Sequence, residues 1–377
     1  MNDWNTWAER ELSGLRAINR YRELIAFDGD GPIGTVRGQR VLSFASNDYL
    51  GLACHPQVKL AAISAIERFG TGATASRLIV GTRSLHGELE SQLAQWNLSE
   101  RALVFSSGYL ANLGVLTALG EQDVTLFSDE LNHASIIDGC RLAKARTLIY
   151  RHLDLQHLRE LLSQTSGRKI VVSESVFSMD GDTAPLPALA ELCCDHGALL
   201  VLDEAHAALG PKLAPTPGLQ VLHVGTLSKT LGALGGFVAG SSRLIELLIN
   251  RARNFIFTTG LSPADTAAAL AAARICQSQE GDQLRARLRS LIDMLRPGHA
   301  SAIVPIILGE DAAALAASAQ LRAAGIHVPA IRPPTVPKGT ARLRVALSAS
   351  HTEAMLDSLR GALARLDSIP SHQLEHA

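Results

Sequence analysis

The sequence predicts an α/β protein with a mainly parallel seven-stranded sheet that contains one antiparallel strand, and a small α+β domain after it. Between about residues 100 and 240, short apolar runs alternate with polar or glycine-bearing turns and with helical patterns. This alternation is typical of a parallel sheet covered by helices. Only residues 226–235 separate the last two runs. A parallel crossover needs about a dozen residues or more, so the last strand is expected to run antiparallel.

The seven predicted strands are short, apolar and rich in β-branched or aromatic residues. They lie at 102–105, 124–127, 147–150, 170–174, 199–203, 221–225 and 236–240. Helical patterns such as LDLQHLRELLSQ and PALAELCCDHG fall between most of them, and Gly197 gives the second pattern a stop signal.

The chain is expected to divide into three parts. Residues 1–45 indicate an N-terminal arm with a helix and a hairpin, and residues 46–285 indicate the large domain that contains the sheet. A long connecting helix is expected at about 245–290. Residues 286–377 change to a different order of strand and helix patterns, which indicates the small α+β domain. Its last helix is expected to open with a capping box of Ser350 and Glu353.

Composition and charge argue against several kinds of partner. The 35 Lys and Arg residues nearly balance the 36 Asp and Glu residues, so no global charge favours nucleic acid or an anionic membrane. No long apolar run and no signal-peptide pattern is present, so we expect a cytoplasmic protein that does not contact a membrane. The 5 cysteines lack metal-site spacing, and we expect reduced thiols and no metal.

Polar side chains follow five of the predicted strands. Ligand sites in open α/β sheets lie beyond the carboxyl ends of the strands, so these residues are expected to meet at one ligand. Each one alone is a weak signal, because single histidines, lysines and glycine turns are usually structural. The candidates are Gly108 and Tyr109, His133, Glu174 and Ser178, Asp203 and His206, and Thr226, Ser228 and Lys229.

Two nucleotide-binding motifs fit poorly. A nicotinamide dinucleotide needs G-x-G-x-x-G directly after a strand, whereas GTGATA at 70–75 follows a helix-like stretch and lacks the third glycine. A P-loop needs G-x-x-x-x-G-K-[ST], whereas GTLSKT has Ser228 before Lys229. Both motifs are therefore disfavoured.

Pyridoxal 5'-phosphate (PLP) fits the candidates better. Its aldehyde needs an amine for a Schiff base, its ring nitrogen needs a carboxylate, and its phosphate needs a helix N-terminus with hydroxyl groups. These groups are present in Lys229, Asp203, Gly108 with Tyr109, and Thr226. The residues therefore favour a PLP-dependent enzyme.

Segments spread over residues 44–344 resemble the α-oxoamine synthase family of fold-type-I PLP enzymes, in the family's order. They are FASNDYLGLACHP, ATASRLIVGTRSLHGELE, SSGYLAN, DELNHAS, ESVFSMDGDTAPL, VLDEAH, GTLSKTLGALGG and AIRPPTVPKGTARLR. The resemblance implies a PLP-dependent acyltransferase that condenses an amino acid with an acyl thioester and releases carbon dioxide. It also implies a homodimer with shared active sites.

The RPPTVP segment favours the branch of this family that uses L-alanine and a pimeloyl thioester. The alternative is another member, such as 2-amino-3-ketobutyrate CoA ligase. Whether the pimeloyl group arrives on coenzyme A or on acyl carrier protein is left open by the sequence, and so is the selectivity for acyl chain length.

The resemblance implies roles around the cofactor ring. Lys229 would carry PLP as a Schiff base, Asp203 would pair with the ring nitrogen, and His206 would contact the phenolic oxygen. His133 would stack on the ring face and assist with the substrate, and Ser178 would lie near the ring substituents. Lys229, His133, Asp203 and His206 are the expected catalytic residues.

The same resemblance implies a phosphate site made of Gly108, Tyr109 and Thr226, joined by Thr258 or Thr259 from a partner subunit.

On the substrate side, Arg332 would bind the amino-acid carboxylate, a task suited to guanidinium. Asn47 and Thr335 would contact substrate. An arginine of NRYREL would do so as well, where Arg20 is favoured and Arg22 is the alternative.

Overall fold

The structure is a computed structural model that describes residues 3–209 and 212–366. The described chain forms two compact units. The larger unit spans Asn47–Ser178 and Asp182–Arg287, and the rest of the described chain forms the smaller unit. None of the described helices is both long and apolar enough to cross a membrane.

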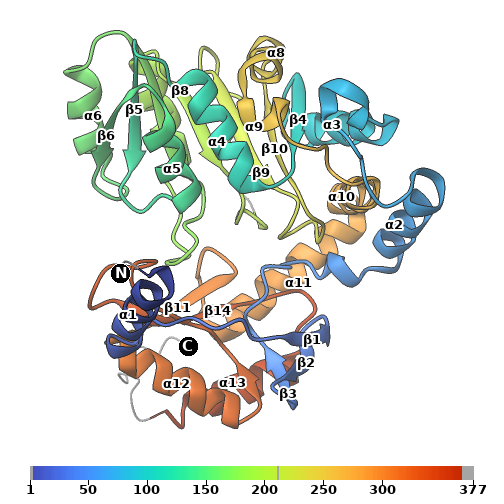
Figure 1. The fold of residues 1–377 in the computed structure, drawn as a ribbon, viewed down its shortest axis with the longest axis vertical. Coiled ribbons are helices and arrows are strands. Elements are labelled where there is room, and N and C mark those ends of the chain that lie inside the picture. Colours follow the sequence, from blue (N-terminus) through green and yellow to red (C-terminus); the bar gives the residue numbers. More distant parts are fainter. Residues whose placement is uncertain (1–2, 210–211, 367–377) are drawn as a thin grey trace. The chain divides into compact units, whose positions relative to one another are not determined.

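The larger unit contains the predicted seven-stranded sheet, in the order β4-β10-β9-β8-β7-β5-β6 (Figure 1). The strands are β4 (Arg101–Phe105), β5 (Val124–Asp129), β6 (Arg146–Tyr150), β7 (Arg168–Glu174), β8 (Leu199–Asp203), β9 (Val221–Thr226) and β10 (Gly236–Gly240). The pairs among β5 to β9 are parallel, whereas β10 is antiparallel to both β4 and β9. The predicted sheet and its single antiparallel strand are confirmed.

The turn between β9 and β10 needs glycine at two positions. Gly232 has φ 62°, and a Cβ there would lie 2.3 Å from the backbone nitrogen of Ala53. Gly235 has φ 131°, and its carbonyl accepts the N–H of Leu227 at 2.9 Å. These positive φ angles are accessible to glycine at little cost, so the chain reverses within nine residues and holds Lys229 in a defined turn.

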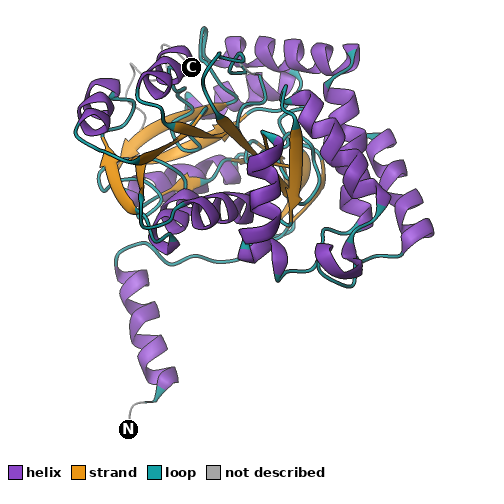
Figure 2. Cartoon of the chain, turned by 90° about the horizontal axis from the view of Figure 1, so that it is seen from above, coloured by secondary structure: helices purple, strands orange, loops and turns teal. Residues whose placement is uncertain are grey.

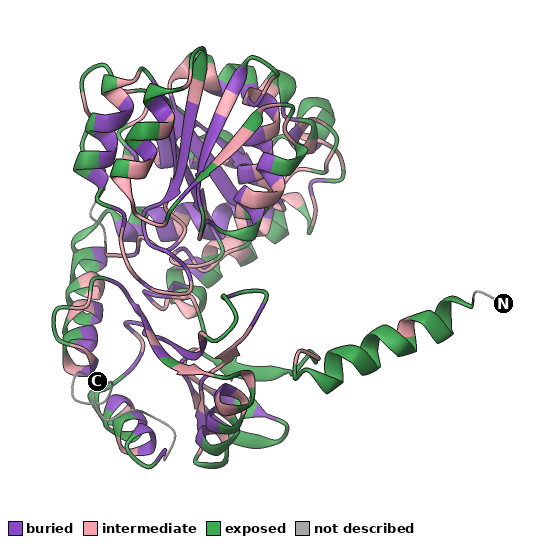
Figure 3. Cartoon of the chain, turned by 90° about the vertical axis from the view of Figure 1, so that its left-hand side faces the viewer, coloured by how far each residue is buried: buried purple, intermediate pink, exposed green. Residues whose placement is uncertain are grey.

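Helices cover both faces of this sheet (Figure 2). Along β8, Val201 belongs to one apolar cluster, whereas Leu200 and Leu202 belong to the other. The first cluster includes residues of α4 (Gly108–Leu119), α5 (Ala134–Leu142), α8 (Ser242–Arg251) and α9 (Arg253–Ile256), and the second includes residues of α6 (Leu155–Ser163) and α7 (Leu186–Asp195). The central strands are buried on both sides (Figure 3), as expected for a parallel sheet.

Four separate helices occupy the region predicted as one connecting helix at 245–290, so that prediction was wrong. They are α8, α9, α10 (Pro263–Cys276) and α11 (Gln279–Leu295). Ser262 caps α10 by accepting the N–H of Asp265 at 3.0 Å, and Pro263 occupies the first turn. Proline has no N–H to continue an earlier helix, so it favours a new helix start at this point. The larger unit also contains α2 (Pro56–Phe69), the 3-10 helix η1 (Leu52–Cys54), the π-helix η2 (Arg77–Gly81) and α3 (Ser84–Trp96).

The smaller unit contains two small sheets. One pairs β1 (Phe27–Asp30), β2 (Ile33–Val36) and β3 (Gln39–Ser43) with β12 (Ile326–His327), and the other has the order β11 (Ile303–Gly309), β14 (Ala341–Ala346), β13 (Ala330–Ile331). Its helices are α1 (Trp4–Ala17), which has no buried residue, α12 (Asp311–Ala323) and α13 (Glu353–Leu363).

The predicted capping box of α13 was wrong. Thr352 is the N-cap residue, and its hydroxyl accepts the N–H of Met355 at 3.3 Å. Ser350 lies two positions too early for this role, and its own N–H donates to the hydroxyl of Ser348. Both Ser and Thr can cap a helix, so only the helix start decides between them.

Candidate active site

Lys229 lies in the turn after β9 and contacts His206 from the turn after β8. The Nζ atom of Lys229 is 2.9 Å from Nε2 of His206, and Nδ1 of the same ring is 2.6 Å from the hydroxyl of Tyr49. Tyr49 is fully buried and donates its hydroxyl proton to Oδ1 of Asn47 at 3.0 Å. The oxygen of Tyr49 is then left to accept from Nδ1, which presents the lone pair of Nε2 to Lys229.

Asp203 ends β8 as a buried carboxylate, with only 6% of the residue exposed. Its Oδ2 accepts the side-chain amide of Asn112 at 2.7 Å, and its Oδ1 accepts the N–H of Ala205 at 2.9 Å. A carboxylate that is buried needs such donors, because burial without them is costly. Asn112 was not singled out from the sequence, although a polar residue in the apolar helix α4 is a signal that could have identified it.

A second buried carboxyl group, Glu174, lies directly beside Asp203. Glu174 ends β7, and the two residues are partners in the parallel pairing of β7 and β8. Burial raises the pKa of Glu174 well above its usual value and the charge of Asp203 raises it further, whereas the N–H groups of His133 and Ser178 and the charge of Lys229 lower it. The two neighbouring carboxyl groups therefore differ in their surroundings, since burial favours the protonated form of Glu174 whereas Asp203 accepts two hydrogen bonds.

The start of α4 forms a cradle for an anion. Ser107 caps the helix by accepting the N–H of Leu110 at 3.1 Å, and the free N–H groups of the first turn carry the positive end of the helix dipole. A Cβ at Gly108 would lie 3.1 Å from Cβ of Thr226, and one at Gly236 would lie 2.4 Å from the nitrogen of Gly108. Glycines therefore bring the helix start against Thr226, whose hydroxyl is 2.7 Å from the hydroxyl of Ser228.

Tyr109 in the first turn of α4 contacts His133, the N-cap residue of α5. Their rings meet edge to face with centroids 6.4 Å apart, and the hydroxyl of Tyr109 donates to Asp138. Tyr109 and His133 are both exposed. The predicted phosphate role of Tyr109 and stacking role of His133 both stay predictions.

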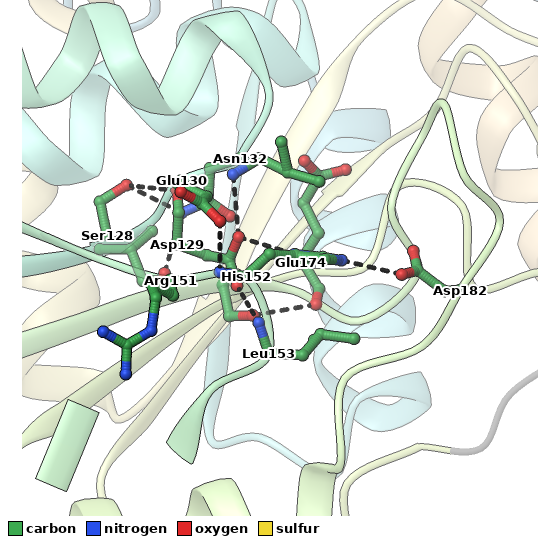
Figure 4. Close-up of polar contacts among 12 residues, drawn as sticks. Ser128, Asp129, Glu130, Asn132, Arg151, His152, Leu153, Glu174 and Asp182 are labelled. Carbon is green, nitrogen blue, oxygen red and sulfur yellow. Dashed lines mark hydrogen bonds and ion pairs between the residues drawn. The ribbon is translucent and has the colours of Figure 1, made fainter. Parts of the chain in front are cut away.

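His152 contacts residues on both sides of the turn that contains Ser178 (Figure 4). Nδ1 of His152 is 2.9 Å from Asp129 of β5, and its Nε2 is 2.8 Å from Asp182. The ring also meets Phe177 edge to face at 4.4 Å, and the N–H of Phe177 donates to the carbonyl of Asp182. Ser178 follows directly after Phe177, so His152 supports the turn that begins at Ser178.

The pairing of His152 should make stability depend on pH. Burial acts to lower the pKa of His152, but the hydrogen bonds and charges of Asp129 and Asp182 outweigh it and raise the pKa to about 10. The unfolded value is about 6.5. The stabilisation is therefore fully present below about pH 6.5 and is lost as the pH rises through about 10, because the folded state holds the proton longer.

Urea unfolding at pH 6, 8 and 10 is the measurement for this prediction. We expect His152→Gln to lower the unfolding midpoint most at pH 6, with the gap to wild type narrowing by pH 10. His196→Gln, at the end of α7, is the matched control and should show a small, constant effect. A gap that widens with pH would contradict the prediction.

The predicted substrate residues Arg20, Arg332 and Thr335 belong to the smaller unit. The guanidinium of Arg332 donates to the carbonyl of Asn19, and Arg20 lies 3.5 Å from Asp311. Thr335 is exposed. Their roles toward substrate stay predictions, as does the role of Asn47.

The two threonines assigned to a partner subunit lie in the larger unit after α9. Thr258 is half-buried and Thr259 is exposed, and the carbonyl of Thr259 accepts the hydroxyl of Ser106 at 3.2 Å. Their contribution to a second copy of the chain stays a prediction.

Known proteins resemble this chain over nearly its full length. The family model described as aminotransferase class I and II matches residues 39–363. The 8-amino-7-oxononanoate synthase of Anaeromyxobacter dehalogenans is 49% identical and the one of Geobacter sulfurreducens is 45% identical. The first alignment covers 95% of this chain and 94% of that relative, and the second covers 94% and 96%.

Solved structures of related enzymes share the fold. Serine palmitoyltransferase from S. paucimobilis, with a bound PLP-myriocin aldimine, has a TM-score of 0.89 at 30% identity, covering 96% of this chain and 97% of that chain. The 8-amino-7-oxononanoate synthase of Francisella tularensis has a TM-score of 0.69 at 28% identity, covering 86% and 96%.

The fold is that of fold-type-I PLP-dependent enzymes. The chain belongs to the class I and II aminotransferase family and, within it, to the family of the 8-amino-7-oxononanoate synthases.

Proposed function

We propose that this chain is a PLP-dependent acyltransferase of biotin biosynthesis that acts in the cytoplasm. It condenses L-alanine with a pimeloyl thioester to give 8-amino-7-oxononanoate, carbon dioxide and the free thiol. The observation that carries the proposal is the pairing of Lys229 with His206 in the same unit as the buried carboxylate Asp203. Identity of 45–49% with the named synthases over nearly the whole chain supports the choice of reaction.

The larger unit offers each group that PLP requires. Lys229 would hold its aldehyde carbon, Asp203 would keep its ring nitrogen protonated, and His206 would donate to or accept from its phenolic oxygen. The helix start at Gly108 and the hydroxyl of Thr226 would hold its phosphate. When bound, PLP supplies a protonated ring that withdraws electrons from the bonds at the amino-acid Cα.

The chain's own groups then move the proton and orient the substrates. Lys229 Nζ would act as the base that takes the proton from Cα of alanine. Cα would then bond to the thioester carbonyl carbon as the carbon-sulfur bond breaks, and the thiolate would leave and take a proton from solvent. Loss of the alanine carboxyl group as carbon dioxide would leave an electron pair at Cα, and the proton held by Lys229 would return there to give the aminoketone. Asn112 and the N–H of Ala205 donate to the two oxygens of Asp203 and would hold its carboxyl group in place.

We propose that Arg332 binds the alanine carboxylate and that Asn47, Thr335 and one of Arg20 or Arg22 contact substrate. The guanidinium of Arg332 suits a carboxylate because it donates two parallel hydrogen bonds. A homodimer, in which Thr258 or Thr259 of the partner subunit completes the phosphate site, is part of the same proposal.

A thioester panel tests the proposed reaction. Purified enzyme with PLP is given L-alanine or glycine together with acetyl, succinyl, pimeloyl or palmitoyl thioesters, and thiol release and product mass are measured. The pimeloyl thioester is supplied in two forms, one with coenzyme A and one with acyl carrier protein. We expect alanine with a pimeloyl thioester to exceed every other pair by about tenfold or more, since a chain-length mismatch costs binding in the transition state. A preference for glycine with acetyl-CoA would instead identify a 2-amino-3-ketobutyrate CoA ligase.

A further inference from the structure

The ring of His133 is linked to Asp203 by a chain of hydrogen bonds through Ser135 and Asn112. Nδ1 of His133 is 3.2 Å from the backbone nitrogen of Ser135 and 2.8 Å from its hydroxyl. That hydroxyl is 2.9 Å from the amide nitrogen of Asn112, which is also 2.7 Å from Oδ2 of Asp203. Ser135 and Asn112 are both almost completely buried, so water does not compete for the bonds between Ser135, Asn112 and Asp203, whereas the ring of His133 at the end of the chain is exposed.

The donors and acceptors along this chain have only one consistent assignment. The backbone N–H of Ser135 can only donate, so Nδ1 of His133 must accept and carries no proton. The hydroxyl of Ser135 therefore also donates to Nδ1, and its lone pairs accept from the amide of Asn112. The other amide hydrogen of Asn112 goes to Asp203, because the reversed amide would place its oxygen against a carboxylate.

The charges around the ring agree with this assignment. Burial lowers the pKa of His133 and the charge of Lys229 lowers it further, whereas the charges of Asp203 and Asp138 raise it, and the result lies below the usual value. Glu174, whose pKa burial raises well above its usual value, and the ring of Tyr109 complete the polar surroundings. The ring is therefore neutral near pH 7, with its only proton on Nε2.

Nε2 of His133 has no hydrogen-bond partner within residues 3–209 and 212–366. Its N–H is thus available to a ligand, whereas Nδ1 is fully occupied. An imidazole in this state can donate a hydrogen bond but cannot take a proton at Nε2.

We propose that Ser135 and Asn112 are positioning residues that fix His133 as a neutral hydrogen-bond donor through Nε2. In the proposed function, on which the ligand in this inference rests, His133 would donate to an oxygen of the substrate as negative charge develops there. Proton removal from Cα would then be left to Lys229 alone. The tautomer itself is a property of the chain and does not depend on which substrates the enzyme uses.

Nitrogen NMR of the full chain, loaded with PLP and labelled with 15N-histidine, tests the tautomer. The signals of His133 are identified as those that disappear in the His133→Asn variant. We expect an unprotonated Nδ1 and a protonated Nε2 at neutral pH. In Ser135→Ala, the pKa of His133 should rise by about one unit, because a donor to the Nδ1 lone pair that favours the neutral ring is lost.

Two further variants are the controls. Ser135→Thr keeps the hydroxyl and should restore the wild-type titration. Ser173→Ala removes an equally buried hydroxyl that donates to the carbonyl of Glu174, and it should leave the His133 signal unchanged. A protonated Nδ1 in wild type, or an unchanged pKa in Ser135→Ala, would overturn the assignment.

Kinetics test the donor role separately. We expect His133→Gln, whose amide can donate, to keep more of kcat than His133→Leu, which should lose about 10²-fold or more. In Ser135→Ala, the acid limb of kcat/KM should move to higher pH together with the NMR titration. Equal losses in the two His133 variants would reject the donor role. If no thioester turns over, the proposed function fails while the NMR result still decides the tautomer.

Discussion

Replacing Lys229 with alanine is expected to lower turnover about 10³-fold or more while the chain stays folded and still binds PLP and alanine. The expected loss is large because Lys229 is, in the proposed function, both the group that holds the cofactor covalently and the base that takes the Cα proton. Binding survives because Gly108, Thr226 and Asp203 do not depend on the lysine. Cofactor absorbance, retention of PLP during gel filtration, and thiol release with alanine and the pimeloyl thioester measure these effects.

Borohydride reduction provides the direct control for this prediction. In the wild type, the cofactor should become fixed to the peptide that contains Lys229, and in the Lys229→Ala variant no lysine should be labelled. Lys144→Ala changes an exposed lysine that pairs with Glu121, and it should leave both labelling and turnover close to wild type. Labelling of another lysine in wild type, or turnover that persists in Lys229→Ala, would rule out the proposed role.

The sheet was predictable because its strands are buried on both faces. Runs such as IVVSE and LLVLD are apolar at every position that contacts one of the two helix layers, so they differ clearly from the helices between them. The short connection at 226–235 also sufficed to predict the direction of β10. The prediction of one helix at 245–290 was wrong because helical periodicity does not reveal a short break between two helices. Here the Ser262 cap and Pro263 start a new helix.

Candidate residues whose side-chain type is required by the chemistry could be predicted from the sequence. The residues that hold those side chains in place were harder to predict. Lys229, Asp203 and His206 follow strand ends, and the topology alone brings those ends together. Tyr49, Asn112 and Ser135 were missed, because their roles depend on contacts between segments far apart in the sequence. Asn112 is separated from Asp203 by 91 positions, and no local pattern encodes that hydrogen bond.

Replacing Asp203 with asparagine is expected to lower kcat/KM about 10²-fold to 10³-fold, the usual cost of removing one charged group aimed at the reacting system. Asparagine has nearly the same shape, and its oxygen can still accept the amide of Asn112, so the fold should be retained. The variant loses the negative charge that, in the proposed function, keeps the cofactor ring nitrogen protonated. Steady-state kinetics with alanine and the pimeloyl thioester, together with the absorbance of the bound cofactor, measure the effect.

Glu174→Gln is the matched control that the chain itself offers. Glu174 and Asp203 are buried carboxyl groups on paired positions of adjacent strands, and each change replaces a carboxyl group with an amide of similar shape. Burial and the neighbouring Asp203 raise the pKa of Glu174 and so favour its protonated form, which glutamine resembles in shape and charge. We expect Glu174→Gln to change kcat/KM by no more than a few-fold. If both variants lost activity equally, the charge would not be the property that distinguishes Asp203, and its proposed pairing with the ring nitrogen would have to be abandoned.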